Sequence, residues 1–221
     1  MVADAGYGAG GEFREGLEAR GERYIVGLLG EELVFAEPPR WVVRAPKRRG
    51  RPPTRAHLAD EAPRPVAVKT LAESLERQTV RWREGTKGWL EAEFAWVRVW
   101  IGHRWERGVP IGAVPDTEAS ARWLLVEWRR DGTVKYALAN LPPETTLEQA
   151  VPLWKERWQV ERGYLQLKDE LGLDHFEGRS WNGFHHHATL TFLAYGFLAL
   201  ERRRAQTLHL TDPPGEVRRG A

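Results

Sequence analysis

Residues 2–28 read VADAGYGAGGEFREGLEARGERYIVGL, and this stretch decides the fold class. The apolar residues 2–3 predict the end of a buried strand, and Asp4 follows them directly. A glycine-rich loop then leads into an apolar spacing that predicts a helix over about 12–19, and the run 24–28 predicts a second strand. Strand, helix and strand form one crossover unit of an α/β sheet. A carboxylate at the C-terminal end of such a strand often belongs to an active site.

Composition narrows the class of protein. Hydrophobic residues make up 42% of the 221 residues, which is enough for a folded core. The absence of cysteine excludes disulfides and thiolate metal sites. The most apolar stretch, 188–200, is shorter than the roughly 20 residues that a membrane-spanning helix needs, and we expect no membrane association. The net charge is only +2 although the pI is about 9.0, so basic character has to be read locally.

A basic, proline-rich segment follows the crossover unit. Residues 38–70 predict an exposed loop or linker, and 40–55 contains seven basic residues and no acidic one. Its Gly-Arg-Pro element with flanking basic residues resembles an AT-hook, which lies in the narrow minor groove of A·T-rich DNA. The alternative is a solvated basic linker, which also attracts phosphate. The candidate DNA-binding residues here are Lys47, Arg48, Arg49 and Arg51.

Residues 77–140 are typical of β structure. Strands are predicted over 93–101, 122–128 and 134–138, and Asp131-Gly132 predicts a tight turn between the last two. The tryptophans of this region either fill the sheet or include one that stacks on a DNA base. They are Trp82, Trp89, Trp96, Trp100, Trp105, Trp123 and Trp128.

The C-terminal part is predicted to be helical. One helix is expected from a cap at Thr145 or Thr146 to about Leu171, then a connector over 173–187 and a final helix over 188–203. Three adjacent histidines begin at position 185, and this spacing does not suit a zinc site. We interpret them as the polar start of the last helix.

Four residues of the first of these helices have an informative spacing. Trp154, Glu161 and Lys168 are seven residues apart, and Arg157 lies one turn before Glu161. A carboxylate between two cations and an aromatic side chain suits a site that handles phosphodiesters and a divalent metal. The alternative is that these residues have only a structural role. In that case Glu161 pairs with neighbouring arginines on a helix surface, and Asp4 caps its loop.

With Asp4-Ala5-Gly6-Tyr7-Gly8 at the start and Trp154-x2-Arg157-x3-Glu161-x6-Lys168 near the end, the chain resembles insertion-sequence DDE transposases. The relevant branch has a Tyr-(2)-Arg-(3)-Glu-(6)-Lys signature, and Trp154 replaces its tyrosine. The resemblance implies an α/β, RNase H-like catalytic fold with a β-rich insertion. It also implies that Asp4 and Glu161 are catalytic ligands of Mg²⁺, with Mn²⁺ as the alternative ion, and that Trp154, Arg157 and Lys168 contact DNA.

The family's first catalytic aspartate lies on a strand upstream of Asp4, for which this chain has no residues. The resemblance therefore implies an N-terminally truncated, C-terminal fragment. We expect it to retain DNA affinity without cleavage. The expected parts are a partial core (1–37), a basic linker with a β-rich insertion (38–140), a helical part of the core (141–205) and a flexible tail (206–221).

The expected partner is double-stranded DNA at the terminal repeats of the mobile element. A dimer is expected for the intact enzyme, in the cytoplasm and associated with the nucleoid. One alternative function is a non-catalytic DNA-binding protein derived from a transposase. Another is a nuclease of a different fold that uses only Asp4 and Glu161.

Overall fold

The computed structural model describes all residues except 9, 45–51, 86–87, 103–104 and 212–221. The chain forms two compact units, Met1–Arg157 and Trp158–Ala221, and each is described by itself. The predicted division into four parts stays a prediction.

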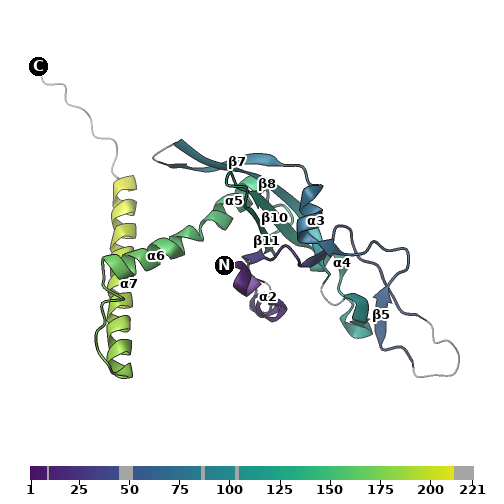
Figure 1. Cartoon of the computed structure of the whole chain (residues 1–221), viewed down its shortest axis with the longest axis horizontal. Helices are drawn as coiled ribbons and strands as arrows, with labels where there is room; N and C mark the ends of the chain where they lie inside the picture. Colours follow the sequence, from purple (N-terminus) through teal and green to yellow (C-terminus); the bar gives the residue numbers. More distant parts are fainter. Residues whose placement is uncertain (9, 45–51, 86–87, 103–104, 212–221) are drawn as a thin grey trace, which may run out of the picture. The chain divides into compact units, whose positions relative to one another are not determined.

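The first unit contains a mixed sheet in which most strands are antiparallel (Figure 1). The strand order is β1-β2-β11-β10-β8-β3-β6, and β7 also pairs with β8. Only β1 and β2 are parallel among the strands described in this sheet. The strands are β1 (Val2–Ala3), β2 (Ile25–Leu28), β3 (Leu33–Phe35), β6 (Val66–Ala67), β7 (Gln78–Gly85), β8 (Gly88–Ile101), β10 (Arg122–Trp128) and β11 (Val134–Ala139). The predicted mixed α/β class is confirmed.

The crossover unit and the hairpin are both present. Helix α2 (Gly11–Glu18) connects the parallel strands β1 and β2 after the short helix α1 (Ala5–Gly8). In the hairpin, Asp131 Oδ1 accepts a hydrogen bond from the Thr133 amide at 2.8 Å, and Gly132 adopts φ +82°. The turn brings β11 back along β10, and β11 then pairs with β2. The hairpin therefore extends the sheet that the crossover unit begins.

Both faces of this sheet are covered. Side chains alternate along each strand, so neighbouring residues of β10 enter different cores. Leu124 and Val126 pack with α2 and α3 (Val68–Glu73), whereas Leu125 packs with α5 (Leu147–Lys155). Figure 1 shows α2 and α5 on opposite sides of the sheet. This two-sided burial explains why β10 reads as an almost continuous apolar run.

The segment predicted as an exposed linker is partly structured. Within 38–70 the chain forms β4 (Trp41–Val42), β5 (Arg55–Leu58) and β6 and begins α3. Strands β4, β5 and β9 (Val109–Pro110) make a small sheet, flanked by η1 (Trp105–Arg107), η2 (Ile111–Ala113) and α4 (Thr117–Ser120). A third core cluster of Phe35, Leu58, Trp100 and Ala121 holds this region together. The linker prediction missed it because the cluster joins residues distant in sequence.

The expectation of one helix to Leu171 is wrong. Helix α5 begins at a capping box formed by Thr146 and Gln149, as predicted, but ends at Lys155. Helix α6 (Trp158–Asp169) follows after a break. Pro152 cannot donate a backbone hydrogen bond inside α5, and the Glu156 amide contacts the carbonyls of both Pro152 and Leu153, which tightens the last turn.

The second unit consists of α6 and α7 (Trp181–Thr211). The connector that was predicted over 173–187 is longer than the observed one, because α7 begins at Trp181 rather than at 188. Ser180 Oγ accepts from the Gly183 amide at 3.1 Å, which caps the helix earlier than the apolar pattern suggested. His187 contacts the Gly172 carbonyl at 2.9 Å, and Arg202 reaches Glu170 at 3.4 Å. None of the described helices is both long and apolar enough to span a membrane.

Candidate functional site

Asp4 is placed by a close approach between α1 and β2. A Cβ atom on Gly8 would lie 1.8 Å from the Gly27 carbonyl oxygen, and one on Gly27 would lie 2.6 Å from the Ala5 amide nitrogen. Only glycine fits at these two positions without a backbone shift. The buried Arg14 donates to the Gly8 carbonyl and fixes the end of α1. The glycine-rich sequence thus sets the backbone that carries Asp4.

The Asp4 carboxylate lies at the carboxyl end of β1 and is about half exposed. Its Oδ1 accepts from the Gly6 amide at 3.0 Å, and its Oδ2 lies 3.6 Å from Arg157 Nη1. The structure therefore brings together two of the residues predicted for the site. A cavity of about 470 Å³ opens beside them, and Lys135 and Trp154 also line it.

The charges of this cavity suit an anion better than a metal ion. Asp4 is the single acidic residue among those lining the cavity, and Lys135 and Arg157 supply two cations. No cluster of three or more His, Asp or Glu side chains with the spacing of a metal site occurs in the described part of the chain. A divalent ion of the two-metal kind requires several carboxylate ligands. The residues beside Asp4 therefore do not fit Mg²⁺ on their own, whereas a guanidinium and an ammonium group fit phosphate oxygens.

Trp154 lies inside the unit rather than on its surface. It is 7% exposed, and its indole Nε1 donates to Glu127 Oε2 at 2.8 Å. Glu127 also accepts from Lys155 Nζ and, at 2.8 Å, from Arg129 Nε. Burial works against the charge of Glu127, but these hydrogen bonds hold its pKa below the ordinary value of 4.5. The DNA contact assigned to Trp154 stays a prediction, while the observed partner is a buried carboxylate.

Glu161 and Lys168 belong to the second unit. Both are exposed on α6 and lie seven residues apart, close to one helical face. The predicted meeting of Asp4 and Glu161 around metal ions is not tested and stays a prediction. In the same unit the ring of His185 lies 4.4 Å from that of Trp181, and His187 contacts a backbone carbonyl. The basic residues Lys47, Arg48, Arg49 and Arg51 lie outside the described residues.

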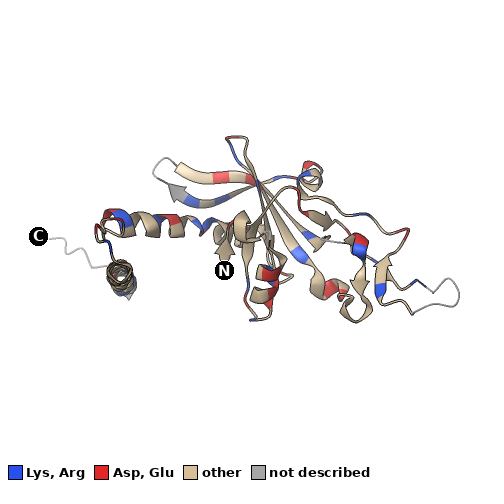
Figure 2. Cartoon of the chain, turned by 60° about the horizontal axis from the view of Figure 1, so that its bottom comes forward, with Lys and Arg blue, Asp and Glu red and all other residues tan. Residues whose placement is uncertain are grey.

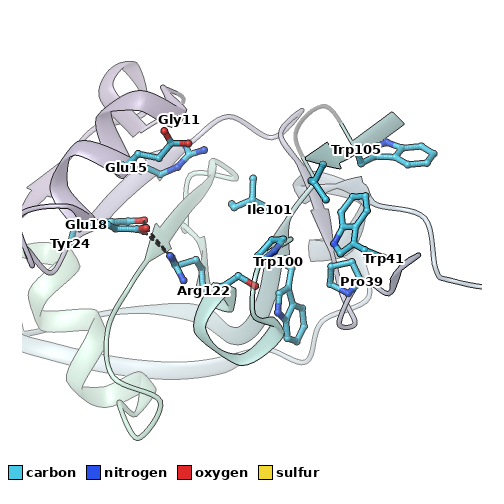
Figure 3. A pocket seen from close by; sticks show the side chains of 14 residues that line it. Gly11, Glu15, Glu18, Tyr24, Pro39, Trp41, Trp100, Ile101, Trp105 and Arg122 are labelled. Carbon is cyan, nitrogen blue, oxygen red and sulfur yellow. Dashed lines mark hydrogen bonds and ion pairs between the residues drawn. The ribbon is translucent and has the colours of Figure 1, made fainter. Parts of the chain in front are cut away.

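A second cavity, of about 230 Å³, lies beside the start of β10, where Arg122 lines it (Figure 3). Trp41, Trp100 and Trp105 line it together with an ion pair between Glu18 and Arg122. Arg122 Nη2 lies 2.8 Å from Glu18 Oε2, and Tyr24 donates to Glu18 Oε1 at 2.7 Å. The polar wall is therefore held by its own hydrogen bonds.

The other predicted tryptophans differ in their surroundings. The rings of Trp96 and Trp123 stack on each other at 4.7 Å, and both contribute to the core on the α5 face. Trp82 lies under the Lys155 ammonium group at 4.3 Å. Trp89 is exposed, with about half of its surface accessible. The structure assigns no base-stacking role to any of them.

Charged residues of both signs are interspersed along the described chain (Figure 2). On β8, Glu91 contacts both Arg81 and Arg130, and Glu93 contacts Arg77. Within these surface pairs the opposite charges neutralise each other, and such pairs contribute little to stability. The cavity beside Asp4 differs from them because its lining has more cations than carboxylates.

Two residues of the Asp4 region were missed by sequence reasoning. Glu127 is a carboxylate inside an apolar strand, and that mismatch was the available signal. Lys135 faces Glu127 directly across the β10–β11 pair, so their side chains lie on the same face of the sheet. No local pattern indicated that Lys135 would line the cavity with Asp4.

Comparison with known proteins gives one result for the first part of the chain. A family model described as DDE superfamily endonuclease matches residues 1–89. The matched region includes Asp4, the β1–α2–β2 crossover and the glycines that place Asp4, and it ends before Trp154. No curated protein matches the chain significantly. The match supports a DDE transposase-type endonuclease domain.

Proposed function

We propose that the chain is a DNA-binding catalytic segment of a DDE transposase with an RNase H-like fold. One observation carries the proposal: Arg157, a residue of the Arg-Glu-Lys motif, lies 3.6 Å from Asp4 at the end of the first strand. These residues are at opposite ends of the first unit's sequence, and a motif without functional meaning gives no reason for them to meet. The family match over 1–89 supports the same reading independently of this motif.

In the proposed function, Arg157 binds a DNA phosphate as a planar fork and Lys168 contributes a second cation. Asp4 and Glu161 are proposed as metal ligands, with Mg²⁺ as the ion and Mn²⁺ as its substitute. The cavity beside Asp4 is lined by a single carboxylate, so we propose that this site binds DNA without cutting it.

The second candidate is a non-catalytic DNA-binding protein derived from a transposase. The charge of the cavity beside Asp4 favours it, since two cations and one carboxylate suit phosphate binding without a metal. Dimerisation, recognition of terminal repeats and association with the nucleoid are proposals for either candidate.

Binding of labelled duplex DNA, measured by fluorescence anisotropy in EDTA, tests the proposal. The purified chain should bind at low salt, and Asp4→Asn should bind roughly threefold more tightly. The reason is that the substitution removes a negative charge from a phosphate cavity and weakens the contact that holds Arg157 beside Asp4. Glu93→Gln is the matched control, because Glu93 is an exposed carboxylate paired with Arg77 on the hairpin. Absence of DNA binding, or weaker binding by Asp4→Asn, would contradict the proposal.

A plasmid-nicking assay tests the expected lack of cleavage, which both candidates share. With Mg²⁺ or Mn²⁺ present, we expect no nicking by the purified chain. Nicking that Glu161→Gln abolishes would show that the chain itself is a metal-dependent nuclease, and the expectation of inactivity would then be wrong.

A further inference from the structure

Glu127 is the most deeply buried carboxylate that the described chain contains, and the function proposed above gives it no role. Its residue surface is 1% exposed, on the face of the sheet that α5 covers. Three donors converge on it: Trp154 Nε1 on one oxygen, and Lys155 Nζ and Arg129 Nε on the other. A buried carboxylate with three such donors is a fixed point in the core, because its removal leaves the Trp154, Lys155 and Arg129 donors without this acceptor.

Two of these donors are on the last turn of α5. Trp154 is fully packed, and the Lys155 side chain is only 15% exposed, with its ammonium group over the Trp82 ring. Helix α5 ends at Lys155, and Arg157, two residues later, extends to Asp4. The end of the helix is therefore attached to the sheet immediately before the chain enters the site.

We infer that Glu127 is a positioning residue of the Asp4 site, which holds Trp154 and Lys155 so that Arg157 stays beside Asp4. The inference rests on the proposed function, in which Arg157 contacts a DNA phosphate. It also accounts for a tryptophan where the transposase signature has tyrosine. An indole is a donor only, which suits a carboxylate acceptor inside the protein.

The neighbouring cations add a second consequence. Lys135 is opposite Glu127 on β11 and lines the cavity with Asp4 and Arg157. Glu127 engages Lys155 and Arg129 directly, whereas no hydrogen bond or ion pair of Lys135 occurs among the described residues. The carboxylate thus lowers the repulsion within a group of cations, one of which faces the proposed phosphate position.

A double-mutant cycle on DNA binding tests the inference in the full-length chain. Arg157→Ala should weaken binding of a labelled duplex roughly fivefold and reduce the slope of log K against log salt by about 0.9. Glu127→Gln, which keeps the shape of the side chain, should reproduce most of both effects. In the Arg157→Ala background, Glu127→Gln should add nothing, because the group that it positions is gone.

Glu18→Gln is the matched control. Glu18 is a partly buried carboxylate with an arginine and a tyrosine hydroxyl as donors (Figure 3). Its partner Arg122 begins β10, whereas Glu127 lies near the end of that strand. The control substitution should lower thermal stability without changing the salt slope. Hydrogen exchange gives a readout that needs no DNA: the amides of 154–157 should exchange roughly tenfold faster in Glu127→Gln and stay unchanged in Glu18→Gln.

The outcomes of these experiments distinguish a failure of the proposed function from a failure of the positioning role of Glu127. If Arg157→Ala binds DNA like the parent chain, the proposed function fails and the inference fails with it. If Arg157→Ala weakens binding but Glu127→Gln leaves binding unchanged, or weakens it equally in both backgrounds, only the positioning role is overturned. Should Glu127→Gln fail to fold, Trp154→Phe removes a single donor and keeps the ring, and it should show the same non-additivity with Arg157→Ala in weaker form.

Discussion

At the scale of single residues, the chain uses carboxylates in two different environments. Asp4 is half exposed, with one oxygen bound to a backbone amide and the other facing Arg157. Glu127 and Glu18 are held inside ion-pair networks. The exposed carboxylate remains accessible to a ligand, whereas the buried ones are committed to holding the fold. Their titration should therefore appear in stability.

We expect the chain to lose stability in mild acid. For Glu127 and Glu18, burial raises the pKa, but the donors around each carboxylate outweigh it and the folded-state pKa lies below the ordinary 4.5. The stabilisation is complete above the unfolded pKa and is lost as the pH falls through the lower folded pKa. The melting temperature by circular dichroism should be level from about pH 7 to about pH 5 and fall below that.

The variant Glu127→Gln gives the check on this assignment. It should melt at a lower temperature than the parent at neutral pH and show a shallower decline in acid, because one of the titrating groups is absent. An unchanged pH profile would mean that Glu127 does not contribute to acid unfolding.

At the scale of elements, the site depends on how closely α1 and β2 pack. The space between Gly8 and the Gly27 carbonyl oxygen has no room for a side chain. Arg14 of α2 donates a hydrogen bond to the Gly8 carbonyl at the end of α1. The crossover is therefore more than a connection between strands, because its glycines determine where Asp4 emerges. A single added methyl group should be felt here and tolerated at an open position such as Gly16.

Gly8→Ala is expected to destabilise the chain by about 2–4 kcal/mol, since the new methyl group would lie 1.8 Å from a backbone oxygen. The matched control is Gly16→Ala within α2, where a Cβ atom would meet no described atom within 4 Å. That substitution should stabilise the helix by about 0.5–1 kcal/mol. Urea unfolding at neutral pH measures both, and equal effects from the two variants would contradict the packing argument.

The elements also show what the sequence could and could not predict. The β1–α2–β2 crossover, the Asp131-Gly132 hairpin and the Thr146 cap depend on local patterns, and all were predicted. The break after Lys155 was missed, and so were the bonds by which Trp154 and Lys155 hold a carboxylate on a distant strand. Long-range contacts of this kind leave no local pattern.

The same distinction applies to the site. Asp4 and Arg157 were predicted from motif residues, and the structure places them together. Glu127 was visible only as an unexplained charge in an apolar strand. The role of Lys135 follows from its register opposite Glu127, which no sequence pattern specifies.

At the scale of the whole molecule, charge is almost balanced, with 33 basic and 31 acidic residues. Many arginines of the first unit are already paired with carboxylates on the surface. Affinity for DNA must therefore come from the few places where cations exceed anions. Two such places are the cavity beside Asp4 and the sequence around Lys47, Arg48, Arg49 and Arg51, which lies outside the described residues.

Replacing Lys47, Arg48, Arg49 and Arg51 together with alanine tests the second place. If each cation neutralises one phosphate, the slope of log K against log salt should fall by about 3–4 units, because each released counterion contributes roughly 0.9. The control is the pair Arg77→Ala and Arg81→Ala, whose guanidinium groups already contact Glu93 and Glu91, and it should change the slope little. If the fourfold variant keeps the full salt slope, the basic segment is not part of the interface, and Arg157 and Lys168 have to account for the affinity.

Combining the fourfold variant with Arg157→Ala tests whether the two places act independently. If the loss of binding free energy equals the sum of the two separate losses, the two places bind different phosphates of the same duplex.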